Sequence, residues 1–356
     1  MTEASLKPGE SSHMNKVSAV IMAAGQGTRM KSAMPKVLHA VAGKPMVWYM
    51  AALARRVADS SVAIVVGHGA DHVREYLQQE EQTLAPYSVV EQTERLGTGH
   101  AVQQARSVVM PDTEAESGHC LILNGDTPLL TEKTVRALLS CHQSTQATVT
   151  ILTTLLGDPH GYGRVIRGPE GQVKKIVEDR DASVDEKAVQ EVNVGTYIVN
   201  TSFLFHSLET LKPQNVQGEY YLTDIIGMAV GQSLRVSALV TNDTNETIGI
   251  NNREHLAIAE KEMRDRVCRH WMQEGVTLLD PSRTSIDPGV MIGRDSVLYP
   301  DVQLEGTTVL GEACHVRSHT RITNSTRGDQ VQVEDSCVFN DVIVENGANI
   351  GPFAHL

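Results

Sequence analysis

Two cationic residues accompany a glycine turn near the start of the chain. The string Gly25-Gln26-Gly27-Thr28-Arg29 directly follows the apolar run 17–22, which is typical of a first β-strand, and Pro35-Lys36 comes next. Backbone N–H groups of such a turn can approach a phosphate, and a guanidinium or ammonium can neutralise its charge. The spacing matches neither the three-glycine dinucleotide fingerprint nor the Gly-Lys-Ser/Thr of a P-loop. The residues therefore predict phosphate chemistry of another kind, with Arg29 and Lys36 as its cations.

The composition restricts the partners of such a site. The chain has 356 residues and a formal net charge of −12. This length suggests two domains, and the acidic balance argues against a nucleic-acid partner. No apolar run is long enough to span a membrane, and the five scattered cysteines contain no Cys-x-x-Cys pair, so we expect neither a membrane partner nor a zinc or disulfide framework. We expect a cytoplasmic protein whose polar residues 1–14 form a flexible arm.

The residues that follow the glycine turn alternate between strand-like and helix-like segments. The expected strands are 17–22, 62–66, 88–91 and 120–123, and the expected helices are 45–58, 70–79, 98–109 and 131–142. Such alternation predicts a Rossmann-like α/β domain with a mixed, mostly parallel sheet. Ligands of these sheets bind beyond the carboxyl ends of the strands. Gly25, Gly67-His68 and Asn124-Gly125-Asp126 all fall at that edge, which indicates one shared site.

Beyond residue 148 the pattern mixes strands, turns and helices. We expect strands at 149–155, 163–166, 173–177, 194–199 and 235–239, and helices at 221–230 and 252–273. The predicted domains are an arm over 1–14, the α/β domain over 15–251, a linker helix over 252–275 and a repeat domain over 276–356.

The repeat domain shows an apolar residue at every sixth position. The series begins with Ile286, Ile292, Leu298, Leu304, Leu310, Val316 and Ile322, slips in phase, and resumes with Val338, Val344, Ile350 and Leu356. A six-residue period predicts a left-handed parallel β-helix with three hexads per coil. Because the chain stops at Leu356 on a repeat position, we expect a β-helix truncated relative to a longer one.

Several ordered strings resemble those of the bifunctional GlmU family, the N-acetylglucosamine-1-phosphate uridyltransferases, within the sugar-nucleotide pyrophosphorylases. The matching strings are the glycine turn through Lys36, Gln92 with 96–101, 125–129, 161–164, 218–224 and 249–252. Two positions depart from the family pattern. Asn124 stands where an aromatic residue often precedes Gly-Asp, and Val194 replaces a small polar residue after Asn193.

The resemblance implies uridylyl transfer from UTP to N-acetylglucosamine 1-phosphate, with Mg²⁺ held by Asp126 and Asn251 and with Arg29 and Lys36 as catalytic cations. It also implies a set of substrate-binding positions: Ala23, Ala24, Gly25, Lys36, Gln92, Gly97, Thr98, Asn124, Gly125, Asp126, Gly163, Glu178, Asn193, Thr223 and Asn251. Within this set, Gln92, Gly97 and Thr98 are the candidates for recognising the base. Gly163, Glu178, Asn193 and Thr223 are the candidates for the sugar pocket.

Other interpretations stay open at this point. From the residues alone, Asp126 could be a turn residue and Asn251 the N-cap of the following helix. The same phosphate chemistry would serve another nucleotide or glucose 1-phosphate, and a non-catalytic scaffold resembling certain translation exchange-factor subunits is a more distant alternative. The family's second reaction, acetyl transfer, uses later β-helix coils, so we expect it to be absent from this chain. A homotrimer formed through the β-helix is also expected.

Overall fold

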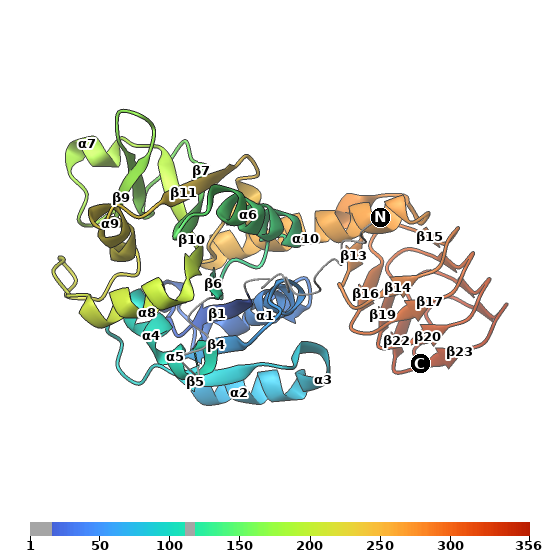
Figure 1. Ribbon diagram of the computed structural model, residues 1–356. Coiled ribbons are helices and arrows are strands. Elements are labelled where there is room, and N and C mark those ends of the chain that lie inside the picture. The colour runs from blue at the N-terminus through green and yellow to red at the C-terminus, as the bar shows by residue number, and fades with distance from the viewer. Residues whose placement is uncertain (1–15, 111–117) are drawn as a thin grey trace, which may run out of the picture.

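The computed structural model describes residues 16–110 and 118–356. An α/β body and a stack of short strands lie side by side, joined by one long helix (Figure 1). The predicted flexible arm over 1–14 lies outside the described residues.

A mixed sheet forms the centre of the α/β body. Its main path runs β11-β7-β10-β6-β1-β4-β5, and the β8–β9 hairpin pairs with β10. β1 is parallel to β4 and β6, and β10 is antiparallel to β6 and β7. The strands are β1 Val17–Ala23, β4 Val62–Val66, β5 Ser88–Glu91, β6 His119–Asn124, β7 Val149–Leu155, β8 Arg164–Arg167, β9 Val173–Val177, β10 Glu191–Asn200 and β11 Val236–Thr241. The predicted mixed, mostly parallel sheet is confirmed.

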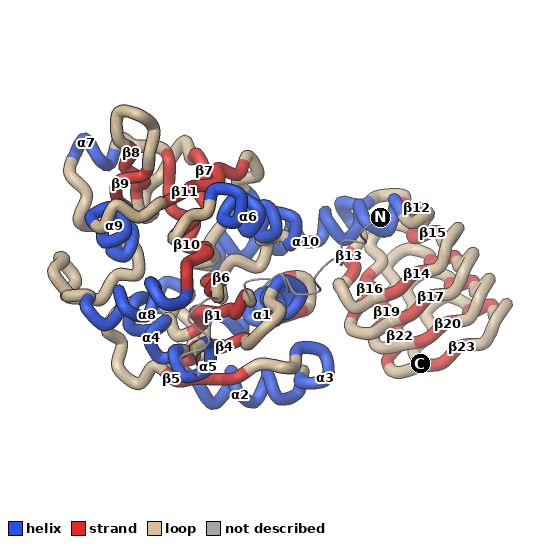
Figure 2. Tube along the Cα trace, viewed as in Figure 1, coloured by secondary structure: helices blue, strands red, loops and turns tan. Residues whose placement is uncertain are grey.

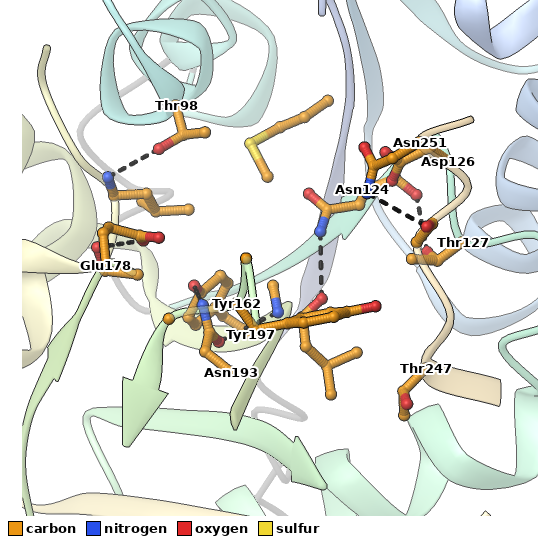
Figure 3. Close-up of a pocket in the computed structure, with 18 residues that line it drawn as sticks. Thr98, Asn124, Asp126, Thr127, Tyr162, Glu178, Asn193, Tyr197, Thr247 and Asn251 are labelled. Carbon is orange, nitrogen blue, oxygen red and sulfur yellow. Dashed lines mark hydrogen bonds between the residues drawn. The ribbon is translucent and has the colours of Figure 1, made fainter. Parts of the chain in front are cut away.

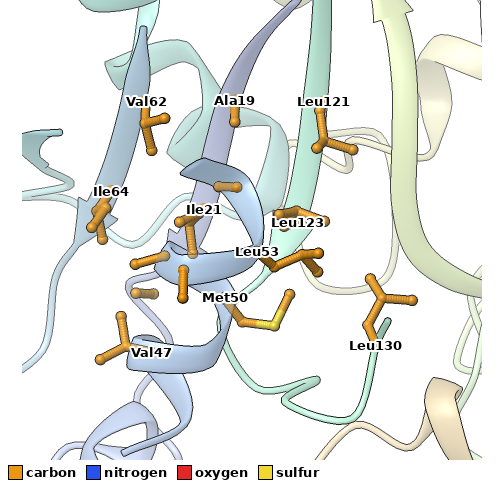
Figure 4. Packing of buried hydrophobic residues seen from close by; sticks show 14 of the residues in the cluster. Ala19, Ile21, Val47, Met50, Leu53, Val62, Ile64, Leu121, Leu123 and Leu130 are labelled. Atoms are coloured by element: carbon orange, nitrogen blue, oxygen red, sulfur yellow. The ribbon is translucent and has the colours of Figure 1, made fainter. Parts of the chain in front are cut away.

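Helices cover both faces of this sheet because successive strand residues point to opposite sides. Ile21 of β1 packs against Met50 and Leu53 of α1 on one face (Figure 4), whereas Val20 belongs to the core of the other face. The first face carries α1 Met46–Val57, α2 Ala70–Gln79, α3 Glu81–Leu84 and α6 Glu132–Thr145. The second carries α4 Thr98–Gln104, α5 Arg106–Val109, α8 Thr201–Thr210 and α9 Asp224–Gly231.

Local details differ from the sequence predictions. The helix expected over 98–109 is split into α4 and α5, and Thr98 is not an N-cap, because its hydroxyl instead accepts a hydrogen bond from the Leu222 N–H. The helix expected over 45–58 begins one residue later, because Pro45 ends the short hairpin of β2 Ala40–Val41 and β3 Lys44–Pro45 and is the N-cap residue of the following helix. The short helix α7 Val184–Lys187 was not predicted. Thr131, the first residue of the helix expected over 131–142, is the N-cap of α6.

The helix α10 Arg253–Gln273 leads from the α/β body to the stack of strands. Three parallel sheets form the stack, in the orders β12-β15-β18-β21-β24, β13-β16-β19-β22 and β14-β17-β20-β23 (Figure 2). These strands are β12 Thr277–Leu278, β13 Ser285–Ile286, β14 Met291–Ile292, β15 Val297–Leu298, β16 Gln303–Glu305, β17 Val309–Leu310, β18 His315–Val316, β19 Arg321–Thr323, β20 Thr326–Arg327, β21 Gln332–Val333, β22 Val338–Asn340, β23 Ile343–Val344 and β24 Asn349–Ile350. The predicted parallel β-helix is confirmed.

Most of the repeat positions lie in the interior of this β-helix, but Leu356 is 52% exposed and Val338 is not an interior position. Phe339, not Val338, pairs with the interior Ile322 and is fully buried. The phase shifts because two hexads are one residue short, those that end at Arg327 and at Val344. Arg327 consequently occupies an interior position, where it is 2% exposed.

Two further features bear on the sequence expectations. None of the helices within 16–110 and 118–356 has both the length and the apolar character needed to cross a membrane. All five cysteines are free thiols.

Candidate functional site

Two adjoining hollows open at the carboxyl edge of β1 and β6. The first, here named the Gln92 hollow, holds about 400 Å³ and includes Ala24, Gly25, Lys36, Gln92, Arg95 and Gly97 in its wall. The second, named the Glu178 hollow, holds about 200 Å³ and includes Tyr162, Gly163, Glu178, Asn193, Tyr197, Thr223 and Asn251. Met22, Thr98, Asn124 and Asp126 belong to both walls. The predicted edge of the sheet is therefore hollowed into two chambers that meet at Asp126.

The glycine turn packs directly against the segment that carries Lys36. Gly27 has φ 63°, and a Cβ at this position would lie 2.6 Å from the Cβ of Lys36. Only glycine suits both the left-handed backbone and this close approach. The turn leads into the 3₁₀ turn Thr28–Met30, which carries Arg29, and the 3₁₀ turn Lys36–Leu38 lies against it.

Four side chains converge between the hollows. The Lys36 ammonium donates to a carboxylate oxygen of Asp126 and to Asn251 Oδ1, the latter at 3.2 Å. Arg29 Nη2 donates to the same Asn251 oxygen at 2.9 Å. The Ile250 N–H donates to the Asp126 carbonyl at 2.9 Å, which holds the 250–251 segment against the end of β6. The helix cap is Asn252, not Asn251, because the Asn252 side chain accepts from the His255 N–H at 2.7 Å.

The pair Asp126 and Asn251 has the chemistry of a magnesium site. One carboxylate oxygen and one amide oxygen already converge on a single cation, the Lys36 ammonium. Mg²⁺ prefers hard oxygen ligands and completes its shell with water and substrate phosphate. Among residues 16–110 and 118–356, no group of three or more His, Cys, Asp or Glu side chains is placed to hold a metal. A metal held by Asp126 and Asn251 would therefore take its further ligands from water and from the phosphates of a bound substrate.

Polar side chains line the Glu178 hollow on opposite sides (Figure 3). Thr223 Oγ1 donates to Glu178 Oε1 at 3.1 Å, and Asn193 Nδ2 donates to the Tyr197 hydroxyl at 2.6 Å. Burial raises the pKa of Glu178, with Asp224 and Asp181 adding to the shift and the Thr223 hydrogen bond opposing it. Burial likewise raises the pKa of Tyr162. This chamber therefore offers carboxyl, amide and phenol groups that suit the hydroxyls of a small polar ligand.

The Gln92 hollow is bordered by backbone and amide groups. Gln92 is 6% exposed, and its Nε2 donates to the Gly97 carbonyl at 3.0 Å and lies 3.1 Å from His100 Nδ1. Gly97 has φ 107°, and a Cβ there would lie 2.7 Å from the Tyr220 carbonyl oxygen. The loop around Gly97 is bound to the Tyr220 segment by two backbone hydrogen bonds, from the Gly99 N–H to the Tyr220 carbonyl at 2.8 Å and from the Tyr220 N–H to the Leu96 carbonyl at 2.7 Å. The bond from Gln92 to the Gly97 carbonyl then holds the amide beside the chamber.

The structure brings most of the predicted positions together. Those in the walls of the two hollows are Ala24, Gly25, Lys36, Gln92, Gly97, Thr98, Asn124, Asp126, Gly163, Glu178, Asn193, Thr223 and Asn251. Arg29 lines an adjacent opening with His160, Glu178 and Arg180. Ala23 and Gly125 lie behind the wall: Ala23 is 2% exposed in the core, and Gly125 N donates to the Met22 carbonyl.

Two aromatic residues of the wall, Tyr162 and Tyr197, were not among the predicted positions. Tyr162 lies inside one of the quoted strings, so its place was indicated, whereas Tyr197 looks like an ordinary strand residue. The two departures from the family pattern contact each other, since Asn124 Nδ2 donates to the Val194 carbonyl at 3.2 Å. The Asn124–Val194 contact lies in the Glu178 hollow.

Comparison with known proteins identifies the family. The family model of the MobA-like NTP transferase domain matches residues 19–183. A bifunctional protein GlmU from Shouchella clausii is 45% identical over 95% of this chain and 72% of its own length. Proteins of the same name from Exiguobacterium sibiricum and Enterococcus faecalis are 46% and 44% identical over 95% of this chain and 73% and 71% of theirs.

The chain belongs to the GlmU family. This confirms the resemblance and makes the chain a nucleotidyltransferase enzyme with a sugar 1-phosphate as the acceptor class. The GlmU assignment agrees with the position of the hollows, because both lie within the α/β body that the NTP transferase model covers in part.

Proposed function

We propose that this chain transfers a uridylyl group from UTP to N-acetylglucosamine 1-phosphate, forming UDP-N-acetylglucosamine and releasing pyrophosphate. The observation that supports this most directly is the meeting of Arg29, Lys36, Asp126 and Asn251 between two chambers. Two polyanionic substrates must approach each other for this reaction, and a cluster of cations at the junction offsets their repulsion.

UTP would occupy the Gln92 hollow. The Gln92 nitrogen is already bonded to the Gly97 carbonyl, so the amide presents its oxygen as an acceptor. Uracil carries one N–H donor on its pairing edge, which this oxygen can accept, and backbone groups near Gly97 and Thr98 suit the flanking carbonyls. Ala24 and Gly25 would lie along the triphosphate, where the absence of long side chains permits close approach.

N-acetylglucosamine 1-phosphate would occupy the Glu178 hollow. Glu178 and Asn193 are already aligned by Thr223 and Tyr197, and their remaining lone pairs and N–H groups suit sugar hydroxyls and the N-acetyl amide. Gly163 forms part of the same wall beside Glu178. The sugar phosphate would then point toward Asp126, where the two chambers meet.

The reaction needs positioning more than acid–base chemistry. A phosphate oxygen of the sugar 1-phosphate is already ionised at neutral pH and forms a bond to the α-phosphorus of UTP, while the bond from that phosphorus to the bridging oxygen breaks and pyrophosphate leaves. Lys36 would hold the phosphate at the centre of this displacement, and Arg29 would hold the leaving phosphates with its planar fork. No side chain has to accept a proton in this scheme.

We propose Mg²⁺ as the cofactor, held by Asp126 and Asn251. When bound, the ion supplies charge neutralisation and orientation of phosphate oxygens. Asp126 and Asn251 would hold the ion through oxygens that now accept from Lys36 and, in the case of Asn251, also from Arg29. Lys36 and Arg29 would then be available to bind substrate phosphates.

We further propose a homotrimer formed through the sheet β14-β17-β20-β23. On its outer surface Met291, Val309, Thr326 and Ile343 follow one another in register, and the three apolar members, Met291, Val309 and Ile343, are 60%, 37% and 83% exposed. Exposed apolar side chains on a flat sheet favour contact with a second copy of the chain. The expected absence of acetyltransferase activity and the cytoplasmic location stay predictions.

The test of the substrate assignment compares kcat/KM for three acceptors, N-acetylglucosamine 1-phosphate, glucosamine 1-phosphate and glucose 1-phosphate, each with UTP. The proposal expects a preference of at least about a hundredfold for the N-acetylated sugar, which corresponds to about 2.7 kcal/mol of discrimination. Equal or better activity with glucose 1-phosphate would contradict the sugar assignment. Replacement of UTP by dTTP, ATP or GTP without loss would contradict the assignment of Gln92 and Gly97.

A further inference from the structure

One arginine at the start of α10 contacts both segments that carry the catalytic cations. Arg253 Nε donates to the Met30 carbonyl at 3.3 Å, and Arg253 Nη1 lies 3.2 Å from His39 Nδ1. Met30 ends the turn that carries Arg29, and His39 directly follows the turn that carries Lys36. A single guanidinium thus links Met30, at the end of the first turn, to His39, which follows the second turn and lies nine positions later in the chain.

The turn that carries Arg29 needs such a contact. It is flanked by left-handed residues on both sides, Gly27 at φ 63° and Lys31 at φ 48°, and it is closed by hydrogen bonds within itself. Arg29 itself is exposed. The hydrogen bonds within the turn do not set its direction relative to the rest of the site, which depends on contacts with other segments, including burial of the Met30 side chain, 1% exposed. The Arg253 bond to the Met30 carbonyl supplies one of these contacts.

The turn that carries Lys36 is tied to the same arginine through His39. The His39 N–H donates to the Lys36 carbonyl at 3.2 Å, and the His39 side chain is 6% exposed. To accept from Arg253, Nδ1 must lack a proton. Burial and the Arg253 charge both lower the pKa of His39, in agreement with a neutral ring.

The position of Arg253 is itself fixed by its neighbours. Asn252 caps α10, and Asn251 accepts hydrogen bonds from both Arg29 and Lys36. Three consecutive residues thus have three roles: Asn252 caps the helix, Asn251 supplies the oxygen between the two cations, and Arg253 joins the Met30 carbonyl to the His39 ring. Arginine suits the third role because its rigid fork reaches two acceptors at once, whereas a lysine ammonium is a single point of contact.

We propose that Arg253 is a positioning residue for the transfer reaction, which sets the direction of Arg29 and Lys36 by linking the Met30 carbonyl to His39. Arg253 acts on the substrates only through these two side chains. The proposal rests on the proposed function, since it concerns how the same cations are held at the junction of the two hollows.

The kinetic test uses Arg253→Met, which keeps the length of the side chain and removes its donors. We expect kcat to fall about tenfold, because small displacements of positioning groups cost rate more than binding, while KM for either substrate stays within about threefold. Arg253→Lys should recover part of this loss. The matched control is Arg269→Met, which alters an exposed arginine on the same helix and should leave kcat unchanged.

A double variant separates positioning from general damage to the fold. In an Arg29→Ala background, Arg253→Met should cost less than about threefold, because much of what Arg253 positions has been removed. A full, multiplicative tenfold loss in that background would overturn the proposal, as would unchanged kcat in Arg253→Met.

Hydrogen–deuterium exchange of the backbone amides tests the same contact without activity. Arg253→Met should raise the exchange rate over residues 27–31 and 37–39, and Arg269→Met should not. Unchanged exchange in both segments would overturn the positioning role even in an active enzyme. Raised exchange in a chain that lacks uridylyl transfer would support the contact and refute only the proposed function.

Discussion

Removal of the Lys36 ammonium is the sharpest perturbation of the proposed site. The side chain is 13% exposed and is bonded to Asp126 and Asn251, so solvent screens its charge only in part. A unit charge about 4 Å from a phosphate oxygen, at an effective dielectric constant of about 20, contributes about 4 kcal/mol. This sets an upper limit of about a thousandfold in rate. If water and Arg29 compensate for most of the lost charge, the loss of transition-state stabilisation is about 1.4 kcal/mol, which lowers the rate by a factor of about ten.

Lys36→Ala should therefore lower kcat/KM for UTP by a factor between about ten and a thousand, and Arg29→Ala by at least about tenfold. Pyrophosphate release under steady-state conditions measures both. Lys133→Ala removes an exposed ammonium on α6 and serves as the control for a change in net charge. Melting temperatures should show that the variants are folded. A Lys36→Ala enzyme within about threefold of the wild type would refute the role assigned to this ammonium.

Three further predictions concern stability and assembly. Arg327→Leu should raise the free energy of unfolding by about 1–4 kcal/mol in denaturant titrations, because the three guanidinium nitrogens are buried without hydrogen-bond partners among the described residues and the Phe339 ring, whose centroid is 3.8 Å from Arg327 Cζ, offsets this cost only in part. A loss of stability would contradict this prediction. Burial, followed by the charge of His119, lowers the pKa of His142 to about 4 from 6.5, so the free energy of unfolding should fall by about 3 kcal/mol as the pH drops from 6.5 toward 4. His142→Gln should flatten this dependence of stability on pH, and an unchanged slope would count against it. If the chain forms the proposed trimer, Ile343→Asp should convert it to monomer in analytical ultracentrifugation, whereas Gln332→Asp on a neighbouring sheet should not. A trimer that survives Ile343→Asp would rule out this interface.

Much of the fold could be predicted because its signals are local and periodic. The strands of the central sheet are short apolar runs bounded by turns, and the β-helix repeats every six residues over many coils. Errors arose where a single residue or a tertiary contact decides. A hexad that is one residue short moves Phe339 into the interior in place of Val338, and the strand period alone does not reveal which hexad is shortened.

Helix α8 was missed for a different reason. Its residues Thr201–Thr210 include β-branched, aromatic and polar types with weak helix propensity, and the helix is stabilised by packing of Leu204, Phe205 and Leu208 on the sheet. The one local signal was Asn200, whose side chain caps the helix by accepting from the Phe203 N–H at 2.9 Å.

The candidate site could be predicted in outline but not in its contacts. Ligands bind at the carboxyl edge of a parallel sheet, and this rule predicted that Gly25 and Asp126 share one site. The meeting of Asp126 with Asn251, which is 125 positions later in the chain, depends on the fold of the whole α/β body and could be expected only from the family resemblance. The bridge from Arg253 to Met30 and His39 has no signature in the sequence, because it is defined only by distance in space.

The most direct test of the central claim is to follow the purified chain with UTP, N-acetylglucosamine 1-phosphate and Mg²⁺ by phosphorus NMR. The account predicts that UDP-N-acetylglucosamine and pyrophosphate appear in equal amounts and that chelation of the metal stops the conversion. Persistence of both substrates in the presence of Mg²⁺, with the protein folded, would contradict uridylyl transfer as the function of this site.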